Sequence, residues 1–370
     1  MGLAKKVLAL TMFVLYLFLG VSPAHAETQI GGRINSSTTL TVENSPYRLT
    51  STLQIPPNVT LTIEPGVVLI PQHQEPVFLV AGTLRILGNK DAPVTISACS
   101  TLFRNAGDWQ YPSTFDIHYL YATDVRSPFG DLNQGLNVTL KNSEFVGPAT
   151  AKYSAFNMPQ LLTFLRTLDI SSNVFSRIPA FRFYLTPQVW TGSENVDVHP
   201  VMNNNLFIGP STTGDWVESP YFDSFRGNTF QDITGKSLMK LGRDYVFTAD
   251  DNFWPNLSID QVKASLDSEI IAPPIVLTSI RTAADPLTPK ASTVLLKEYA
   301  DAKAAADAKA AAKKYKNCAS LNLVFPGGIA KSASALNKGG SAKNPYFVSA
   351  VGYKSNSSLD RDHDGIACEK

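Results

Sequence analysis

Asn173-Val174-Phe175 is the stretch that decides the fold of most of this chain, because its pattern returns three times. An asparagine followed two residues later by an aromatic residue recurs in Asn205-Leu206-Phe207, Asn228-Thr229-Phe230 and Asn252-Phe253-Trp254. The intervals are 32, 23 and 24 residues, close to one coil of a three-sided β-solenoid with loops of varying length. Stacked coils place like residues in register, so we expect stacked aromatic rings and a hydrogen-bonded ladder of asparagines.

Short apolar runs of β character lead up to these repeats. They follow one another every seven to ten residues, a spacing that fits a sandwich, a barrel or a solenoid, and the internal repetition favours the solenoid. The clearest runs are Thr60–Ile63, Val67–Ile70, Phe78–Val80, Leu84–Leu87 and Val94–Ile96.

Both ends of this region resemble a known architecture. The segment from Ser45-Pro46-Tyr47 to Ile63-Glu64-Pro65-Gly66-Val67 resembles the first coils of bacterial right-handed parallel β-helix proteins, and Thr248–Trp254 resembles their last coil. Those proteins more often have Tyr-Trp-Gly where this chain has Phe253-Trp254-Pro255. The resemblance implies a mainly β fold, with a right-handed parallel β-helix over residues 27–288.

The first 26 residues have the pattern of a secretory signal peptide,. Lys5 and Lys6 form a charged region, Val7–Gly20 an apolar region, and Ala24-His25-Ala26 a cleavage site of small residues. The apolar run is shorter than the roughly 20 residues of a membrane-spanning helix; an uncleaved anchor is the alternative. We expect a secreted, extracellular chain that begins at Glu27, with or without attachment to the cell surface, and no transmembrane segment after cleavage.

The net charge bears on the choice of partner. Without Lys5 and Lys6 the chain has 30 basic and 31 acidic residues, a net charge of −1. This balance gives no electrostatic reason to expect a nucleic acid or an acidic polymer as partner.

A segment rich in alanine and lysine, residues 289–314, follows the β region. Alanine has the highest helix propensity, and we expect nothing between Lys297 and Lys316 to break a helix,. Beyond Ala300 the segment has no apolar stripe other than alanine. A semi-rigid helical spacer is therefore favoured over a coiled coil.

The end of the chain, Asp360-Arg361-Asp362-His363-Asp364-Gly365-Ile366-Ala367-Cys368-Glu369, describes a calcium loop. Ca²⁺ takes about six to eight oxygen ligands, and alternate residues of a tight loop can point carboxylates inward. The closing glutamate comes at position ten of the loop, whereas an EF-hand places it at position twelve,. The predicted ligands are the side chains of Asp360, Asp362, Asp364 and Glu369 and the backbone carbonyl of Ile366.

The pattern around this loop resembles a known family. Tyr315-Lys316-Asn317-Cys318 and the final Asp-x-Asp-x-Asp-Gly-Ile-Ala-Cys-Glu resemble the excalibur domain, a small extracellular calcium-binding module of bacterial proteins. The resemblance covers residues 315–370 and implies a bound calcium ion. The stretch Ser332–Tyr353 is longer than in the simplest members.

Three cysteines remain after the predicted cleavage. Cys318 and Cys368 flank the module, and an exported protein can keep a disulfide, so we expect a bridge between them,. Such a bridge stabilises a unit that is too small to build a large core. Cys99 is left over, and a buried, inert thiol is its expected state.

Parallel β-helices also carry polysaccharide lyases and hydrolases, so an enzyme is the alternative. Glycoside hydrolysis needs two carboxylates that face each other. Asp250-Asp251 is the only adjacent acidic pair of the β region, and neighbours on a strand point to opposite faces, so a structural role is favoured. A group of aromatic residues could either stack on sugar rings or pad the fold: Trp109, Tyr111, Tyr119 and Tyr121.

The sequence thus predicts a secreted bacterial calcium-binding protein that binds a wall component, a glycan or a surface protein. No catalytic residue is assigned. The alternative is a carbohydrate-active enzyme, a polysaccharide lyase or hydrolase with its site on one flank of the β-helix, and the third interpretation is a structural spacer.

Overall fold

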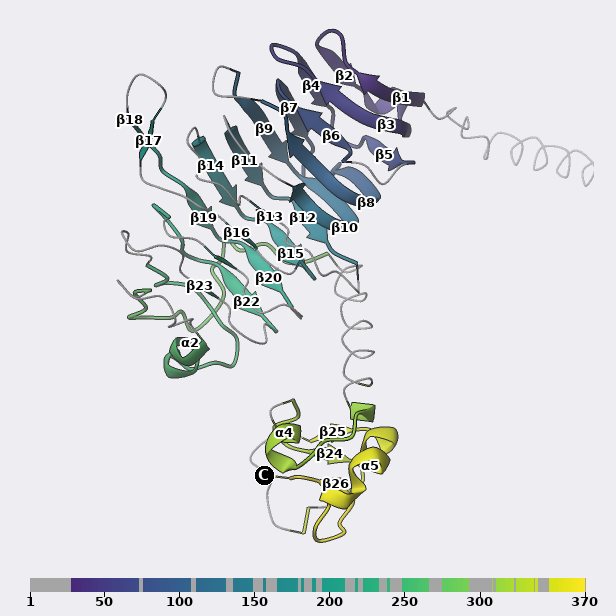
Figure 1. Ribbon diagram of the computed structural model, residues 1–370, viewed down its shortest axis with the longest axis vertical. Coiled ribbons are helices and arrows are strands. Elements are labelled where there is room, and N and C mark those ends of the chain that lie inside the picture. Colours follow the sequence, from purple (N-terminus) through teal and green to yellow (C-terminus); the bar gives the residue numbers. More distant parts are fainter. Residues whose placement is uncertain are drawn as a thin grey trace, which may run out of the picture. The chain divides into compact units, whose positions relative to one another are not determined.

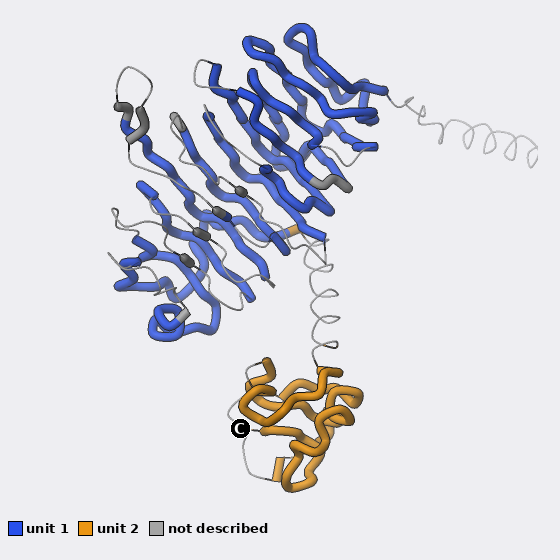
Figure 2. The backbone as a smooth tube through the Cα atoms, in the orientation of Figure 1, with its two compact units in different colours: residues 1–291 blue, residues 292–370 orange. Residues whose placement is uncertain are grey.

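The computed structural model describes residues 28–72, 76–107, 111–130, 136–148, 156–157, 165–178, 181–182, 188–190, 195–209, 217–218, 222–232, 238–239, 248–265, 275–292, 308, 311–322, 324–335, 337–338 and 346–369. The expected signal peptide and most of the expected helical spacer lie outside these residues. The chain divides into two compact units, residues 1–291 and residues 292–370 (Figure 2).

Unit 1 is built from two main sheets (Figure 1). The chain alternates between them, and consecutive strands of each sheet pair in parallel, so the predicted mainly β, parallel fold is confirmed. The main series of neighbouring strands in the first sheet is, in order, β1 (Thr28–Arg33), β3 (Tyr47–Ile55), β5 (Val68–Pro71), β8 (Val94–Asn105), β10 (Leu120–Gly130), β12 (Glu144–Val146), β15 (Val174–Ser176), β20 (Leu206–Ile208) and β22 (Thr229–Gln231). The same sheet also contains β6 (Phe78–Val80), β13 (Phe156–Asn157), β16 (Phe181–Arg182), β21 (Val217–Glu218) and β23 (Leu238–Met239).

In the part of the chain that the structure describes, the second sheet has seven strands, and its buried residues share one core with those of the first sheet. Its strands alternate buried and half-buried residues, as β9 and β11 show, because successive side chains of a strand point to opposite faces,. In order along the chain these strands are β2 (Thr38–Leu40), β4 (Thr60–Ile63), β7 (Thr83–Leu87), β9 (Ser113–His118), β11 (Leu136–Lys141), β14 (Leu165–Ser171) and β19 (Val201–Asn203).

Four smaller elements complete the description of unit 1. A 3-10 turn, η1 (Val42–Asn44), lies between β2 and β3, and an antiparallel pair joins β17 (Gln188–Trp190) to β18 (Asn195–Asp197). Helix α2 (Ile259–Ser265) follows the last coil.

The predicted asparagine ladder is present and runs through the core. Each Oδ1 accepts a hydrogen bond from the backbone amide of the rung before it: Asn205 from Asn173 at 3.0 Å, Asn228 from Asn205 at 2.9 Å, and Asn252 from Asn228 at 2.8 Å. All four asparagines are fully buried. A buried polar group must be hydrogen-bonded, so the ladder keeps the coils in one register.

The ladder has one rung more than the sequence pattern indicates. Asn173 Oδ1 accepts from the amide of Ser143 at 2.9 Å, so Ser143-Glu144-Phe145 occupies the equivalent place in the preceding coil. The residue before each rung has a positive φ, which bends the chain into the next strand: Asn142 52°, Ser172 58°, Asn204 58°, Gly227 66° and Asp251 61°,.

The aromatic residues stack as predicted. The ring centroids of Phe145 and Phe175, and of Phe175 and Phe207, are 5.5 Å apart, with interplanar angles of 10° and 18°. Phe207 to Phe230 is 5.0 Å and Phe230 to Trp254 is 4.8 Å. Offset stacking at these spacings is favourable beyond the apolar area it buries.

Unit 2 is a small module that a disulfide closes. Cys318 and Cys368 are bridged, with their Cα atoms 5.1 Å apart, as predicted. Their neighbours in the core include Leu321, Phe325 and Ile329. The elements are α4 (Cys318–Asn322), β24 (Ile329–Ala330), β25 (Phe347–Val348), α5 (Ala350–Asn356), η2 (Ser357–Leu359) and β26 (Ile366–Ala367), with β24 in the centre of the three-stranded sheet.

The expectation of an unbroken helix up to Lys316 is wrong at its end. Ala311 is helical, whereas residues 313–317 are not. The side chain of Asn356 explains this: its Nδ2 donates to Lys313 O at 2.8 Å, and its Oδ1 accepts from the amide of Tyr315 at 2.8 Å. Ala311, which precedes the predicted start of the module at residue 315, is fully buried among the core residues of unit 2.

Candidate calcium site

The candidate loop connects η2 to β26. Gly365 has a φ of 91° and His363 a φ of 56°, and a β-carbon is poorly tolerated at the first of these values. Strand β26 is held by antiparallel pairing with β24, and Lys331 donates its amide to Gly365 O at 2.7 Å. Backbone bonds on both sides of the turn thus define the loop.

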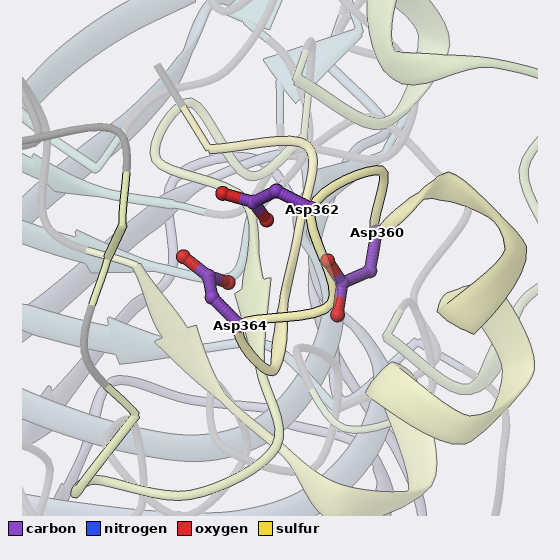
Figure 3. Close-up of side chains that lie close together, drawn as sticks. All are labelled: Asp360, Asp362 and Asp364. Carbon is purple, nitrogen blue, oxygen red and sulfur yellow. The ribbon is translucent and has the colours of Figure 1, made fainter.

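Three aspartates converge in this loop. Carboxylate oxygens of Asp360, Asp362 and Asp364 all lie within 4.8 Å of one another. Figure 3 shows the three side chains gathered along one turn of the chain. Asp360 is buried, Asp364 is half-buried and Asp362 is exposed, so the cluster opens to solvent on one side.

The two oxygens of Asp360 have different surroundings. Oδ2 accepts hydrogen bonds from the Tyr353 hydroxyl at 2.6 Å and from the Gly365 amide at 3.0 Å. Oδ1 is buried and has no hydrogen-bond partner among the described residues. Burial acts to raise the pKa of Asp360, but the Tyr353 hydroxyl and nearby backbone amides outweigh it and lower this pKa. The carboxylate is therefore ionised, with one oxygen available.

Asp364 is oriented by two backbone amides. Its Oδ1 accepts from Ile366 N at 2.9 Å, and its Oδ2 accepts from Lys338 N at 2.8 Å. A carboxylate oxygen has two lone pairs, so these bonds orient the group and leave acceptor capacity for a cation.

Glu369, the predicted closing ligand, is not one of the three clustered carboxylates. Its Oε2 is buried and has no hydrogen-bond partner among the described residues. Burial raises the pKa of Glu369, and the negative charges of Asp364, Asp362 and Asp360 raise it further. A buried carboxylate oxygen without a partner, close to other negative charges, is costly unless a cation neutralises it.

The carbonyl of Ile366 is directed away from β24. In an antiparallel pair, residues alternate between sending both backbone groups toward the partner strand and sending both away. Gly365 O bonds to Lys331 N across the pair, whereas the amide of Ile366 bonds to Asp364 within the loop. The Ile366 carbonyl therefore lies on the loop side, as a seventh-position carbonyl ligand would require.

These groups fit a hard divalent cation. The donor set is entirely oxygen, it is rich in carboxylates, and two of its buried oxygens lack partners. Such a set suits Ca²⁺, which accepts irregular coordination, better than Mg²⁺, which demands an octahedron. The structure brings the three aspartates together, places Glu369 close enough for their charges to raise its pKa, and leaves the side chains of Arg361 and His363 exposed.

Three residues around the loop carried no signal in the sequence pattern. Tyr353 from α5 bonds Asp360. Lys338, from the segment between β24 and β25, bonds Asp364. Asn322 from α4 donates to Cys368 O at 3.0 Å, next to Glu369. Each contact joins residues from separate elements, and no spacing rule connects them.

The acidic pair of the β region has structural partners. Asp250 accepts from Thr278 Oγ1 at 2.8 Å and Ser279 N at 3.0 Å, and Asp251 pairs with Arg281 NH1 at 2.8 Å. These contacts bind the segment after residue 275 to the last coil. Of the other predicted features, Trp109 and the side chain of Cys99 lie outside the described residues.

No helix within the described ranges combines the length and the apolar character needed to span a bilayer.

Comparison with known proteins identifies the C-terminal module. The model of the Excalibur calcium-binding domain family matches residues 315–369. An uncharacterized protein, YhjA of Bacillus subtilis (strain 168), is 48% identical over 65 residues, which are 18% of this chain and 73% of that protein. No solved structure matches the chain.

The match agrees with the geometry of the loop. Excalibur is a calcium-binding domain, and the aspartate cluster could hold a metal ion. This domain and the disulfide are both consistent with an extracellular protein,. Through residues 315–369, the chain belongs to the family of proteins with an Excalibur calcium-binding domain.

Proposed function

We propose that this chain is a secreted bacterial protein whose C-terminal module binds one Ca²⁺ ion. The proposed ligands are the side chains of Asp360, Asp362, Asp364 and Glu369 and the carbonyl of Ile366. The observation that carries the proposal is the pair of buried carboxylate oxygens without partners, Asp360 Oδ1 and Glu369 Oε2. A cation is the group that would compensate both at once.

Calorimetric titration of the full chain with calcium tests this proposal. We expect one ion per chain, with an affinity on the order of 10⁻⁴–10⁻³ M, which suffices outside a cell. Asp362→Ala should abolish binding. His363→Asn is the matched control, because asparagine tolerates the positive φ of this position and the side chain is exposed,. Equal binding by the wild type and Asp362→Ala would exclude the proposed site.

The proposed organisation has four parts: a signal peptide (1–26), a right-handed parallel β-helix (27–288), a helical linker (289–314) and the calcium module (315–370). Two sheets of parallel strands, joined by a chain that alternates between them, support the β-helix. Connections between parallel strands of one sheet are right-handed in about 98% of cases, because of the twist of the strands, which supports the proposed hand.

The partner that we propose is a component of the bacterial cell wall, and the distribution of charge favours an anionic one. The whole chain is nearly neutral, but its two compact units have net charges of opposite sign. Residues 292–370 have 12 basic and seven acidic residues, a net charge of +5, whereas residues 27–291 have 18 basic and 24 acidic residues, a net charge of −6. Basic side chains exposed on unit 2 are Lys313, Lys314, Lys316, Lys331, Lys338, Lys354 and Arg361.

Calcium would strengthen this asymmetry. Four of the seven acidic residues of unit 2 belong to the proposed ligand set, so a bound Ca²⁺ would raise the net charge of the unit from +5 to +7. Sedimentation of the full chain with a glycerol-phosphate polymer, with and without calcium, tests the idea. The amount of protein that sediments with the polymer should increase with calcium in the wild type and not in Asp362→Ala. Equal sedimentation with a neutral glycan would favour a glycan partner instead.

The alternative is a carbohydrate-active enzyme with its site on a flank of the β-helix. The hydrogen bonds of Asp250 and the ion pair of Asp251 favour a structural role for the one adjacent acidic pair of that region. Release of sugars from pectin, alginate or chondroitin-type polymers by the full chain, lost when a flank carboxylate is replaced, would establish the alternative.

A further inference from the structure

Lys338 reaches the calcium loop from a distant part of the module. It lies between β24 and β25, 26 residues before Asp364 in the sequence. Its backbone amide donates to Asp364 Oδ2 at 2.8 Å. Its ammonium group donates to the backbone carbonyls of Asp362 at 3.2 Å and His363 at 3.4 Å. One residue thus places a backbone donor and a positive charge on the loop that holds the aspartates.

Several hydrogen bonds that hold the loop do not involve the ammonium group. Gly365 N bonds Asp360 Oδ2, Ile366 N bonds Asp364 Oδ1, and Lys331 N bonds Gly365 O across the β24–β26 pair. All of these bonds are independent of the Lys338 side chain. The backbone amide of Lys338, which orients Asp364, is also kept when the side chain is changed.

What the side chain adds is a charge. The ammonium group is bonded to the carbonyls of two consecutive loop residues, so it is held on the loop that carries the aspartates. Without metal, a positive charge there offsets the mutual repulsion of three aspartates,. With a divalent cation in the loop, the same charge repels the ion.

We propose that the ammonium group of Lys338 sets the calcium affinity of the module, as a fixed positive charge that weakens binding. This inference rests on the proposed calcium site and concerns a residue outside its ligand set. The backbone amide of Lys338 orients Asp364, and its side chain opposes the cation. The module then has a lower affinity than its four carboxylates would otherwise produce.

The size of the effect follows from the exposure of the group. Lys338 is exposed, so its repulsion of a divalent ion in the loop would be felt through a largely aqueous medium and would amount to about a fivefold to tenfold change in affinity at low salt. Because solvent ions screen exposed charges, the change should shrink in concentrated salt.

Calorimetric titration of the full chain with calcium, at low and at high salt, tests the proposal. Lys338→Met keeps the length of the side chain and removes its charge, and it should bind calcium about fivefold to tenfold more tightly than the wild type at low salt. Lys338→Arg keeps the charge and should stay within about twofold of the wild type. Lys316→Met is the matched control, since it removes the same charge from an exposed residue for which the structure describes no bond to the loop. It should have little effect.

The outcomes separate this inference from the proposed function. If the wild type binds calcium and Lys338→Met binds it equally or more weakly, the charge of Lys338 does not oppose the ion and the inference is wrong. Tighter binding by Lys338→Met and Lys338→Arg alike would also overturn it, because charge would not be the cause. If the wild type binds no calcium at all, the proposed function and this inference fall together.

Discussion

The hydroxyl of Tyr353 donates a 2.6 Å hydrogen bond to Asp360 Oδ2 and thereby decides which oxygen of Asp360 stays available. This bond to Asp360, together with burial, raises the pKa of Tyr353 to about 12, so the hydroxyl remains a donor throughout the physiological range. A donor that holds one oxygen of a metal-binding carboxylate orients the other toward the ion, as outer-shell partners do in other metal sites.

Tyr353→Phe should weaken calcium binding without preventing folding. The ring remains packed, but Asp360 loses its strongest neutral donor and can rotate. We expect the calcium affinity, measured by calorimetry, to fall roughly tenfold, at the lower end of the range for outer-shell substitutions. Tyr346→Phe is the control, because its hydroxyl bonds the carbonyl of Ala335 and no carboxylate. An unchanged affinity in Tyr353→Phe would show that Asp360 needs no orienting donor.

Calcium binding should weaken as the pH falls through the raised pKa of Glu369. A ligand must be deprotonated to bind the ion, and burial together with the charges of three aspartates raises this pKa above its ordinary value of 4.5. The pKa of Asp360 is lowered, so Asp360 stays ionised where Glu369 is already taking up a proton.

Titrations at a series of pH values between 7 and 4 measure this effect. In Glu369→Gln the affinity should be lower at pH 7 and should change less with pH. The folding stability of metal-free unit 2 should depend on the protonation of Glu369 in the opposite direction. A carboxyl whose folded pKa is raised favours the folded state once it is protonated, so this contribution to stability appears as the pH falls,. A calcium affinity that rises as the pH falls would contradict the prediction.

Loss of the Cys318–Cys368 bridge should destabilise unit 2 and weaken calcium binding. The bridge spans a sequence separation of 50 residues, and such a constraint contributes on the order of 4 kcal/mol by limiting the unfolded chain. Glu369 follows Cys368 directly, so an unbridged chain must order this ligand when it binds the ion. Thermal unfolding and calorimetry of Cys318→Ser, with Cys99→Ser as the control, measure both effects. Peptide mapping without reductant should show Cys99 outside the bridge.

Asn205→Ala should be strongly destabilising in unit 1. Asn205 is fully buried, its Oδ1 accepts from Asn173 N at 3.0 Å, and its Nδ2 donates to Ile170 O at 2.9 Å. Removing the side chain takes away both of these bonds, and a buried backbone group that loses its partner costs about 1–3 kcal/mol. Asn137→Ala is the control, because Asn137 is only half-buried and makes a long 3.4 Å bond to Thr114. Similar unfolding midpoints for the two variants would mean that the ladder contributes little.

The exported chain should begin at Glu27. Cleavage after Ala26 follows from the small residues of Ala24-His25-Ala26 that end the apolar run,. Mass spectrometry of the protein from a culture medium measures the N-terminus directly. A peptide that still contains Met1 in that fraction would show that the segment is retained.

The features that the sequence predicted are periodic or local. The asparagines and aromatic rings of the β region recur at intervals of one coil, and stacking of identical coils turns that interval into a ladder without further information. The repeat pattern does not predict the rung at Ser143, because serine replaces asparagine there, although its amide makes the same bond. The aspartate cluster could also be predicted from the sequence, since its carboxylates alternate within five residues and a glycine follows them.

Contacts between separate elements could not be predicted from local sequence patterns. The end of the helix near Ala311 depends on the amide of Asn356, 43 residues away from the carbonyl of Lys313 that it bonds. Local propensity favours a longer helix, and the tertiary bond ends it. The division of charge between the two units likewise follows from where the compact units separate, which the net charge of the whole chain conceals.

The sequence by itself therefore determined the type of metal site and the stacking of the β region, because backbone turns and repeats need only neighbouring residues. The tertiary structure decided which oxygens of the site are free and which charges face it. Tyr353 and Lys338 reach the loop from α5 and from the segment between β24 and β25. Their effect on a cation depends on distance in space, which separation along the chain does not predict.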